Sequence, residues 1–547
     1  MSNRFATIAL TIFASLVGVF ILFVCSLFLF PGVYMFGVKY IAPNTHSVTS
    51  GVVDIKEKVG NFSGVIVNSY EVPVIVEFNG GYDYTFEYAD NYNGLTTSNI
   101  SNPSYTMEKD DNGNVVITIS EFHTIIYQSV NSERYVKISL PLKDIAVDDK
   151  YATSFTLNST KSAITFQKEQ NEDTRIPRFY GVSITTNGNV KYSVEVKANT
   201  YTYNTNNSIT IDKNAKTCVD AENYNLTSNN GNITIIDDVS GDLNLKTDQG
   251  KILLRSCKNL TAETRYGNIG YYAITTTDEE GKTIPDEGSV KIGGIVVINA
   301  RSGSVTLGEV EGVNGNNNIS TTSGNVKIKS IYDGSVETQR GSINIESVRN
   351  FTAKSNSGKI NITKVTGSLN TETARGAITL GSETEYVKDI KVFSRIGKVS
   401  IQSASGKAEI ETLSSDIRFI NGTGRDSYVN ELKITCGGEL YAEGLRGNVE
   451  IKSEKDVSLS FANVSEGNTY ISLGDKCTKA TVYALNNLKN EVNYVLVGKR
   501  VIIQENQNNS ISKLEEKDRY EIKADSPYSF KAEGANVELS ICFKSSI

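Results

Sequence analysis

A five-residue unit that recurs at regular intervals is the feature that most constrains the fold of this chain. The unit is Gly-x-[Ile/Val/Leu]-x-[Ile/Leu], and successive copies at Gly341, Gly358 and Gly376 lie 17 and 18 residues apart. So short a unit cannot bury its own apolar face, so neighbouring units must stack. The unit begins at Gly231, Gly241, Gly250, Gly288, Gly303, Gly324, Gly341, Gly358, Gly376, Gly397 and Gly447.

Within each unit, apolar and polar residues alternate as in a half-buried β-strand. Ile360 and Ile362 are expected to face inward, and Asn361 between them outward. Weaker turn positions, Asn350 and Gly367, fall midway between the stronger ones and give a half-period of about nine residues. One coil is therefore predicted to contain a strand, a corner, a second strand and a second corner. This pattern predicts an all-β fold, a β-solenoid of the single-stranded β-helix kind with about 18 residues per coil.

Composition agrees with this fold and excludes one class of function. The chain of 547 residues has 44 Gly but only 8 Pro, as expected where strands must donate hydrogen bonds on both sides. The glycine at the start of each unit is expected to occupy a corner with positive φ. With 55 Lys and Arg against 62 Asp and Glu, the net charge is −7. A dedicated nucleic-acid-binding protein should carry a basic face, so nucleic acid is not an expected partner.

Three stretches interrupt the period. They are polar and comprise residues 276–287, 382–395 and 423–431. Each is predicted to be an excursion from a corner of the solenoid, where proteins of this architecture often carry binding residues.

The N-terminal region predicts a membrane anchor. No charged residue occurs from 5 to 38, and residues 6–30 are long enough to cross a bilayer as a transmembrane helix. A cleaved signal peptide is the alternative, but its apolar core should be shorter and should end at small residues. Arg4 and the terminal amine lie on one side of this segment and Lys39 on the other, which favours an internal N-terminus with the bulk of the chain outside the cell membrane.

The flanks of the repeat are also rich in strand-like runs, although less regular. Solenoid ends need covering because an open end is an aggregation-prone edge. The predicted organisation is an anchor at 1–40, a β-rich N-terminal cap with the first coils at 41–220, the regular solenoid at 221–475, and a β-rich C-terminal cap at 476–547.

Several of these segments resemble the bacterial "putative adhesin" domain family. They are residues 137–141 (KISLP), 302–307 (SGSVTL), 323–328 (SGNVKI) and 357–362 (SGKINI). In that family an early strand ending in Leu-Pro precedes repeated Ser-Gly-x-Ile-x-Ile coils, and an N-terminal membrane segment is common. The resemblance implies a β-solenoid of the cell envelope and supplies no catalytic residue.

Candidate catalytic and metal-binding residues are sparse. His46 and His123 have no neighbouring His or Cys in the sequence. The densest group of carboxylates is Asp237, Asp238, Asp242 and Asp248, which could resemble a calcium site of a polysaccharide-active β-helix enzyme. No other acidic cluster recurs on the neighbouring coils, so solvated corner residues are the preferred interpretation. We therefore predict no catalytic, cofactor-binding or metal-binding residue, no cofactor and no enzymatic activity.

No disulfide is expected within two pairs of cysteines whose spacing in the sequence is similar. Cys218 and Cys257, and likewise Cys436 and Cys477, are separated by about two coils. Two coil spacings amount to ~9.6 Å, beyond the ~7 Å that a disulfide allows between Cα atoms.

Three functional hypotheses follow from the sequence. The leading one is a membrane-anchored, cell-surface β-solenoid that acts as a non-enzymatic, adhesin-like binding or scaffolding protein, with envelope polysaccharide or a surface protein as partner. The second is a polysaccharide-active β-helix enzyme, which requires Asp, Arg or Tyr side chains to converge in a groove on one face. The third is a membrane-tethered cytoplasmic scaffold that polymerises end to end.

Overall fold

The fold is all-β and β-helix-like, as the repeat predicts. Two compact units make up the chain, Met1–Thr227 and Ser228–Ile547. The computed structural model describes residues 12–22, 42–96, 104–120, 125–128, 133–145, 151–169, 174–213, 219–273, 275–277, 283–285, 288–312, 316–422, 428–463, 466–485, 491–507 and 510–544.

Two β-sheets form the first unit. The strands used here are β1 (Ala42–Asp54), β2 (Gly64–Ser69), β3 (Val74–Asn79), β4 (Thr85–Thr96), β5 (Ser104–Lys109), β6 (Val115–Ser120), β7 (Ile125–Gln128), β8 (Glu133–Pro141), β9 (Thr153–Ser159), β10 (Ile164–Lys168), β11 (Arg178–Thr185), β12 (Val190–Tyr192) and β13 (Lys197–Thr205). The first sheet has the order β1-β4-β8-β3-β10-β12, with β7 paired to β4. In the second sheet β5 pairs antiparallel with β6, and parallel pairing continues through β2, β9, β11 and β13.

Aromatic side chains pack the two sheets of this unit together. Phe78 and Phe166 come from the first sheet, and Phe155 and Phe179 from the second; all four are fully buried. The ring centroids lie 6.1 Å apart for Phe78 and Phe179, and 5.9 Å apart for Phe155 and Phe166. These contacts join the sheets because large aromatic rings fill the space between them.

Three short helices are described, all in the first unit. They comprise residues 12–22, α2 (Ile55–Val59) and α3 (Leu142–Ile145). The first covers part of the predicted membrane segment, and the rest of residues 6–30 lies outside the described residues. None of the described helices is both long enough and apolar enough to cross a bilayer.

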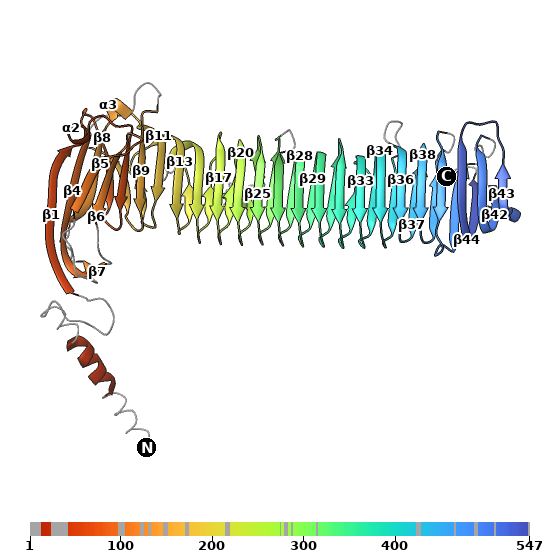
Figure 1. Ribbon diagram of the computed structural model, residues 1–547, viewed down its shortest axis with the longest axis horizontal. Helices are drawn as coiled ribbons and strands as arrows, with labels where there is room; N and C mark the ends of the chain where they lie inside the picture. Colours follow the sequence, from red (N-terminus) through yellow and green to blue (C-terminus); the bar gives the residue numbers. More distant parts are fainter. Residues whose placement is uncertain are drawn as a thin grey trace, which may run out of the picture. The chain divides into compact units, whose positions relative to one another are not determined.

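The second unit is a stack of parallel coils (Figure 1). Val326 pairs in register with Ile343, Ile343 with Ile360, and Ile360 with Ile378, so an uninterrupted coil takes 17 or 18 residues. This spacing agrees with the predicted period.

Each coil presents two main faces to solvent, which we name face A and face B. Face A contains β16 (Ile233–Ile235), β18 (Ile252–Leu254), β21 (Ile269–Tyr271), β26 (Val305–Val310), the first parts of β28 (Val326–Thr338), β29 (Ile343–Ser355) and β34 (Val399–Thr412), β30 (Ile360–Val365), β32 (Ile378–Leu380), β35 (Ile417–Asn421), β37 (Leu440–Leu445), β39 (Val457–Phe461) and β41 (Lys479–Leu485). Face B contains β17 (Asp242–Thr247), β20 (Asn259–Thr264), β25 (Val296–Ala300), β27 (Asn317–Thr321), the last parts of β28, β29 and β34, β31 (Leu369–Thr373), β33 (Val387–Ser394), β36 (Val429–Cys436), β38 (Asn448–Ser453) and β40 (Thr469–Leu473).

A short third side, absent from the two-strand prediction, connects the faces. In β29, Ile343 and Ile345 point inward on face A, and Phe351 and Ala353 do so on face B. Val348 lies between them, buried, and stacks in register with its neighbours in the adjacent coils. The inward positions of one coil thus form three columns of apolar side chains, and each column continues into the next coil.

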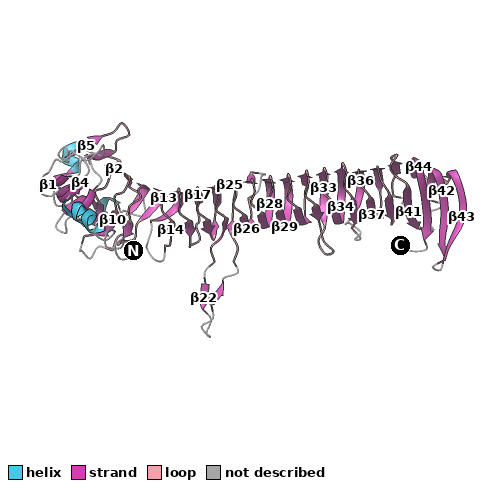
Figure 2. Cartoon of the chain, turned by 90° about the horizontal axis from the view of Figure 1, so that it is seen from below, coloured by secondary structure: helices cyan, strands magenta, loops and turns pink. Residues whose placement is uncertain are grey.

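The predicted excursion at 276–287 is present as a hairpin. Strands β22 (Thr275–Thr277) and β23 (Thr283–Pro285) pair antiparallel in a separate two-stranded sheet, which stands away from the coils (Figure 2). Ile269 pairs directly with Val305, so the coil absorbs this insertion without losing its register.

The excursion predicted at 382–395 is wrong over most of its length. Residues Val387–Ser394 form β33. Its buried Val387 continues the short third side in register with Val365, and its buried Ile390 begins the part on face B in register with Leu369. Asp389 has a φ of 43°, and the register shifts beside it. Two residues, Lys388 and Asp389, separate the inward-facing Val387 and Ile390, where a strand has one, and this hides the alternation. In the third stretch, 423–427 lies outside the described residues, and β36 begins at Val429.

Most glycines at the unit starts are required because the backbone of the neighbouring coil leaves no room for a Cβ atom. The expectation that they occupy positive φ was wrong for these positions. A Cβ atom on Gly358 would lie 1.8 Å from the carbonyl oxygen of Gly341, and one on Gly341 would lie 1.9 Å from that of Gly324. The backbones of successive coils therefore touch at this corner. A positive φ does occur at Gly447. The members of this glycine ladder are Gly231, Gly250, Gly267, Gly303, Gly324, Gly341, Gly358, Gly376 and Gly397.

Buried hydroxyl groups hold the same corner. In most coils a Ser or Thr stands three residues before the ladder glycine, and its oxygen accepts that glycine's N–H at 2.8–3.0 Å. The acceptors are Ser228, Thr247, Thr264, Thr338, Ser355, Thr373 and Ser394. Ala300 occupies the corresponding position in one coil, in register with Thr264 and Thr321.

At the C-terminal end of the stack, the last strand in the sequence, β44 (Ser529–Lys544), lies between the last coil and the two strands that precede it, β42 (Asn493–Gln507) and β43 (Ser510–Ile522). Strand β44 pairs with both β40 and β41, and so covers both faces of the last coil. Strand β42 pairs parallel with β44, and β43 pairs antiparallel with β42. Phe530 lies 5.3 Å from both Phe461 and Tyr494, measured between ring centroids, so aromatic rings replace the aliphatic columns at this end.

A glycine-to-alanine exchange tests the steric role of the ladder. We expect Gly358→Ala to destabilise the fold by about 1–3 kcal/mol or more, because the new methyl group would collide with rigid backbone. Gly293→Ala is the matched control, since nothing lies within 4 Å of its Cβ position, and it should change stability by less than about 0.5 kcal/mol. Urea unfolding followed by circular dichroism measures both, and equal effects would contradict the ladder.

Two buried threonines of β31 should respond in opposite directions to the same substitution. Thr373→Val removes the acceptor of the Gly376 N–H and should cost about 1–3 kcal/mol. Thr371 is fully buried, and its hydroxyl has no hydrogen-bond partner among the described residues. Thr371→Val removes this unpaired group and should raise the free energy of unfolding by up to about 1 kcal/mol. Urea midpoints of the two variants that shift in the same direction would refute this account.

Candidate functional site

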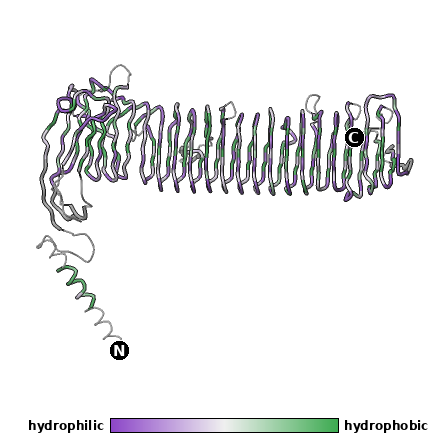
Figure 3. The backbone as a smooth tube through the Cα atoms, in the orientation of Figure 1, coloured by the Kyte–Doolittle hydropathy of each residue, from purple (hydrophilic) through white to green (hydrophobic). Residues whose placement is uncertain are grey.

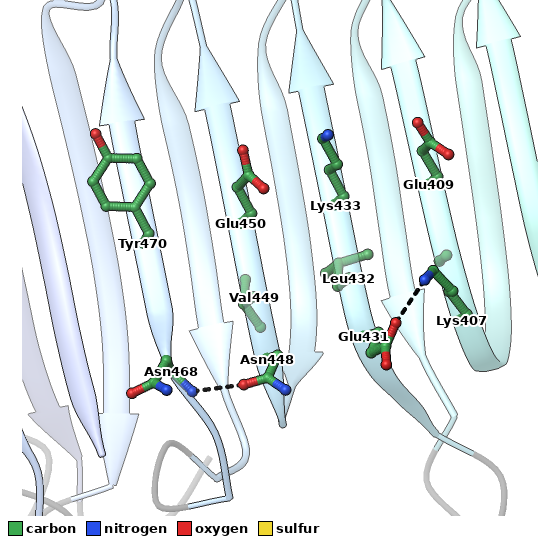
Figure 4. A pocket seen from close by; sticks show the side chains of 11 residues that line it. Lys407, Glu409, Glu431, Leu432, Lys433, Asn448, Val449, Glu450, Asn468 and Tyr470 are labelled. Carbon is green, nitrogen blue, oxygen red and sulfur yellow. Dashed lines mark hydrogen bonds and ion pairs between the residues drawn. The ribbon is translucent and has the colours of Figure 1, made fainter. Parts of the chain in front are cut away.

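Shallow grooves lie along both faces of the second unit, and the two nearest its C-terminal end are on opposite faces. The groove on face B has a volume of about 560 Å³ and crosses β34, β36, β38 and β40 (Figure 4). Its outward side chains form rows because residues in register on successive coils point the same way. One such row is Glu409, Lys433, Glu450 and Tyr470.

Most polar groups of the face B groove are bound, either to one another or to residues beside the groove. Lys407 forms an ion pair with Glu431 at 2.7 Å, and Lys391 pairs with Glu409 at 3.3 Å. The hydroxyl of Tyr470 donates to Glu533 at 2.6 Å. Exposed pairs of this kind add little stability, but they keep the hydrogen-bonding groups of this face occupied.

The groove on face A has a volume of about 460 Å³ and a different character. Arg418, Tyr441, Ser458 and Thr481 are in register on four successive coils. The guanidinium carbon of Arg418 lies 4.9 Å from the centroid of the Tyr441 ring, within the range of a cation–π contact. The Tyr441 hydroxyl donates to Glu443 at 2.6 Å, which fixes the ring along β37. This bond, together with burial, raises the pKa of Tyr441 above its usual value.

Charged corner residues line the sides of the face A groove. They are the cations Lys398 and Lys479 and the anions Asp416, Glu439 and Asp456. Within the part of the chain that the structure describes, Lys398, Arg418 and Lys479 take part in no ion pair. The face A groove therefore offers cationic donors beside an aromatic ring, whereas most charges of the face B groove neutralise each other.

The two aspartates of the face A groove hold the corners of the coils. Asp416 Oδ1 accepts the N–H of Glu439 at 3.0 Å, and Asp456 Oδ1 accepts those of Thr478 and Lys479 at 2.8 and 2.9 Å. Burial of Asp456 opposes ionisation, but these N–H groups outweigh it and lower its pKa. A general acid needs a raised pKa, so this environment suits a fixed, ionised acceptor.

Three of the four aspartates singled out from the sequence contact different residues of the following coil. Asp238 accepts from the Ser256 hydroxyl at 2.5 Å, and Asp242 accepts from the Asn259 amide at 2.7 Å. Asp248 forms an ion pair with Arg265 at 3.0 Å. Over the described ranges, no group of three or more His, Cys, Asp or Glu residues could hold a metal ion.

The remaining residues considered from the sequence are dispersed. His46 lies in β1, whereas His123 and Cys218 are outside the described residues. Cys257, Cys436, Cys477 and Cys542 are buried, and none of them forms a disulfide with another described residue. Burial raises the pKa of Cys257 to about 12 and that of Cys477 to about 11, with smaller contributions from Asp242 and Asp456 respectively. A raised thiol pKa disfavours the nucleophilic thiolate.

Comparison with family models, with curated proteins and with solved structures found no match for this chain.

Reasoning from the sequence did not identify the face A groove. Arg418 and Tyr441 are 23 positions apart, so a period of 18 does not align them. One local pattern in the sequence could have indicated it. Arg418 stands two residues after Asp416, and Tyr441 stands two residues after Glu439, so each occupies the same outward position after an acidic corner residue. That Arg418 and Tyr441 are in register follows only once the length of the coil between them is known.

The buried thiols give a prediction about reactivity and pH. In the native chain at pH 8, Cys257, Cys436, Cys477 and Cys542 should react with iodoacetamide far more slowly than in the urea-unfolded chain. Because the folded-state pKa of Cys257 and Cys477 is raised, their stabilising contribution is complete below about pH 9 and is lost as the pH rises towards 11–12. Cys257→Ala should therefore flatten this fall in unfolding free energy. Peptide mapping measures the alkylation of each cysteine, and urea unfolding at several pH values measures the stability. An equally steep fall in Cys257→Ala would contradict the prediction.

Proposed function

We propose that this protein is a membrane-anchored, non-enzymatic binding or scaffolding protein of the cell envelope. The observation that carries the proposal is the pair of open, polar grooves on the faces of a rigid β-helix-like stack. Their carboxylates accept hydrogen bonds from the next coil or pair with neighbouring cations. Such an arrangement presents a fixed surface for binding, and the resemblance to envelope adhesin domains points the same way.

The anchor rests on the uncharged run of residues 5–38. The described part, 12–22, is helical, and Figure 3 shows it in the colour of hydrophobic residues. Its large apolar side chains are exposed. Phe13 and Leu22, for example, are 67% and 71% exposed. Lipid acyl chains are the natural covering for a helix that is apolar around its whole circumference. In this proposal residues 6–30 cross the cell membrane, and the bulk of the chain lies outside.

The two alternatives account for fewer of these observations. A polysaccharide-active enzyme would need a groove with Asp, Arg and Tyr, and face A has one, but its aspartates are occupied at the corners. A scaffold that polymerises end to end would need a strand edge ready to pair. At the C-terminal end, seven of the thirteen residues of β43 are charged, which discourages edge pairing.

Protease accessibility on intact cells tests the topology. We expect added protease to remove a C-terminal epitope tag from the full-length protein while an N-terminal tag stays protected. Permeabilised cells serve as the control for tag accessibility. Protection of the C-terminal tag on intact cells would overturn the proposal in favour of a cytoplasmic scaffold.

The full chain, solubilised in detergent, should also retain purified cell-envelope material without altering it. Release of shortened saccharides from that material would overturn the non-enzymatic assignment.

A further inference from the structure

We infer that the face A groove around Tyr441 is a saccharide-binding site for a neutral, linear glycan. This inference rests on the proposed function, because it names the ligand class that such a surface-binding protein would take. A sugar ring has an apolar face of C–H groups and a rim of hydroxyls. Recognition therefore calls for an aromatic ring surrounded by hydrogen-bonding groups, and the groove provides both.

The ring of Tyr441 is available for stacking. It is 38% exposed although it lies on a strand of the stack. Arg418 in the preceding coil contacts the ring, while the residue in register in the following coil is the small Ser458. Thr481 continues this low floor in the next coil. A flat ligand can therefore lie against the phenol ring above the two hydroxyl-bearing side chains.

Charged donors and acceptors surround that position. Three cations, Lys398, Arg418 and Lys479, line the groove together with three anions, Asp416, Glu439 and Asp456. Hydrogen bonds from sugar hydroxyls to charged groups are stronger than those to neutral groups. The equal number of positive and negative groups favours an uncharged saccharide over a polyanionic one.

The direction of the groove favours a linear chain. Outward side chains in register recur every ~4.8 Å from coil to coil, which is close to the length of one sugar unit. Ser400, Arg418, Tyr441, Ser458 and Thr481 form one such row across the strands. A glycan that runs along the stack would meet a polar side chain at each coil.

The face B groove is the less suitable of the two. Its tyrosine, Tyr470, is less exposed than Tyr441. Both tyrosines donate their hydroxyl to a glutamate and have a cation near the ring, so exposure is what separates them. The surrounding Lys407 and Glu431 are bound to each other. A saccharide there would have to displace existing ion pairs before it could form its own bonds.

Binding of defined oligosaccharides to the full chain in detergent micelles tests the inference. The probes are neutral linear hexasaccharides (cellohexaose, chitohexaose and a mannohexaose) and, as a charged comparator, hexagalacturonate. Isothermal titration calorimetry should detect at least one neutral probe. Tyr441→Ala should weaken its binding about tenfold or more, and Arg418→Ala should weaken it as well, whereas Tyr441→Phe, which keeps the ring, should retain most of the affinity.

Tyr332→Ala is the matched control. Tyr332 is 49% exposed and has the guanidinium of Arg349 5.5 Å from its ring centroid, yet it lies outside the groove. This variant should bind the probe as the wild type does, and thermal unfolding should show that all the variants are folded.

The possible outcomes separate this inference from the proposed function. Absence of binding to every neutral probe, preference for hexagalacturonate, or unchanged binding in Tyr441→Ala would overturn the saccharide site alone, provided that envelope material is still retained. Hydrolysis of a bound hexasaccharide would instead overturn the non-enzymatic function. A C-terminal tag protected on intact cells would overturn the surface topology, whatever the titrations show.

Discussion

Backbone contact between successive coils at the glycine ladder is the constraint on which the second unit depends. At Gly358 there is no room for a side chain, since the carbonyl oxygen of Gly341 occupies the place of a Cβ. The N–H of the same glycine would be buried without a partner if Ser355 did not accept it. Steric exclusion and hydrogen-bond satisfaction therefore act on one corner and fix its sequence as [Ser/Thr]-x-x-Gly. Because each corner positions the next, the inward columns of Ile, Val and Leu stay in register over many coils.

A scaffold held from within leaves its outward residues free to differ between coils. Face B uses this freedom to pair charges from coil to coil, as in Lys407 with Glu431. Face A instead places small hydroxyl-bearing residues around an arginine and a tyrosine, and leaves the cations there without carboxylate partners among the described residues. The same backbone thus carries one face whose charges are largely paired and, on the other face, a groove whose three cations form no ion pair among the described residues.

Periodicity alone predicted the coil length and the inward positions such as Ile360 and Ile362, because both follow from local alternation and steric repeat. Periodicity failed wherever the pairing of strands depends on bulges, corners or extra residues between the repeats. The bulge at Asp389 made β33 look like a loop. The short third side at Val348 was missed because it contributes a single inward residue to each coil, and a single residue shows no alternation. Arg418 and Tyr441 are neighbours only because their coil is longer than its predecessor, and no fixed period can bring such residues together.

The C-terminal end shows how a stack of parallel strands can be closed by its own chain. Each coil leaves a row of backbone groups unpaired on its outer side, and a further coil would only move that row outward. Here the chain passes outward to β42, reverses in β43 and returns as β44 to fill the layer against β40 and β41. The outermost strand is therefore antiparallel and rich in charge. Edge pairing with a second copy would have to desolvate those charges, so growth from this end is disfavoured and the outward faces remain the surfaces suited to binding.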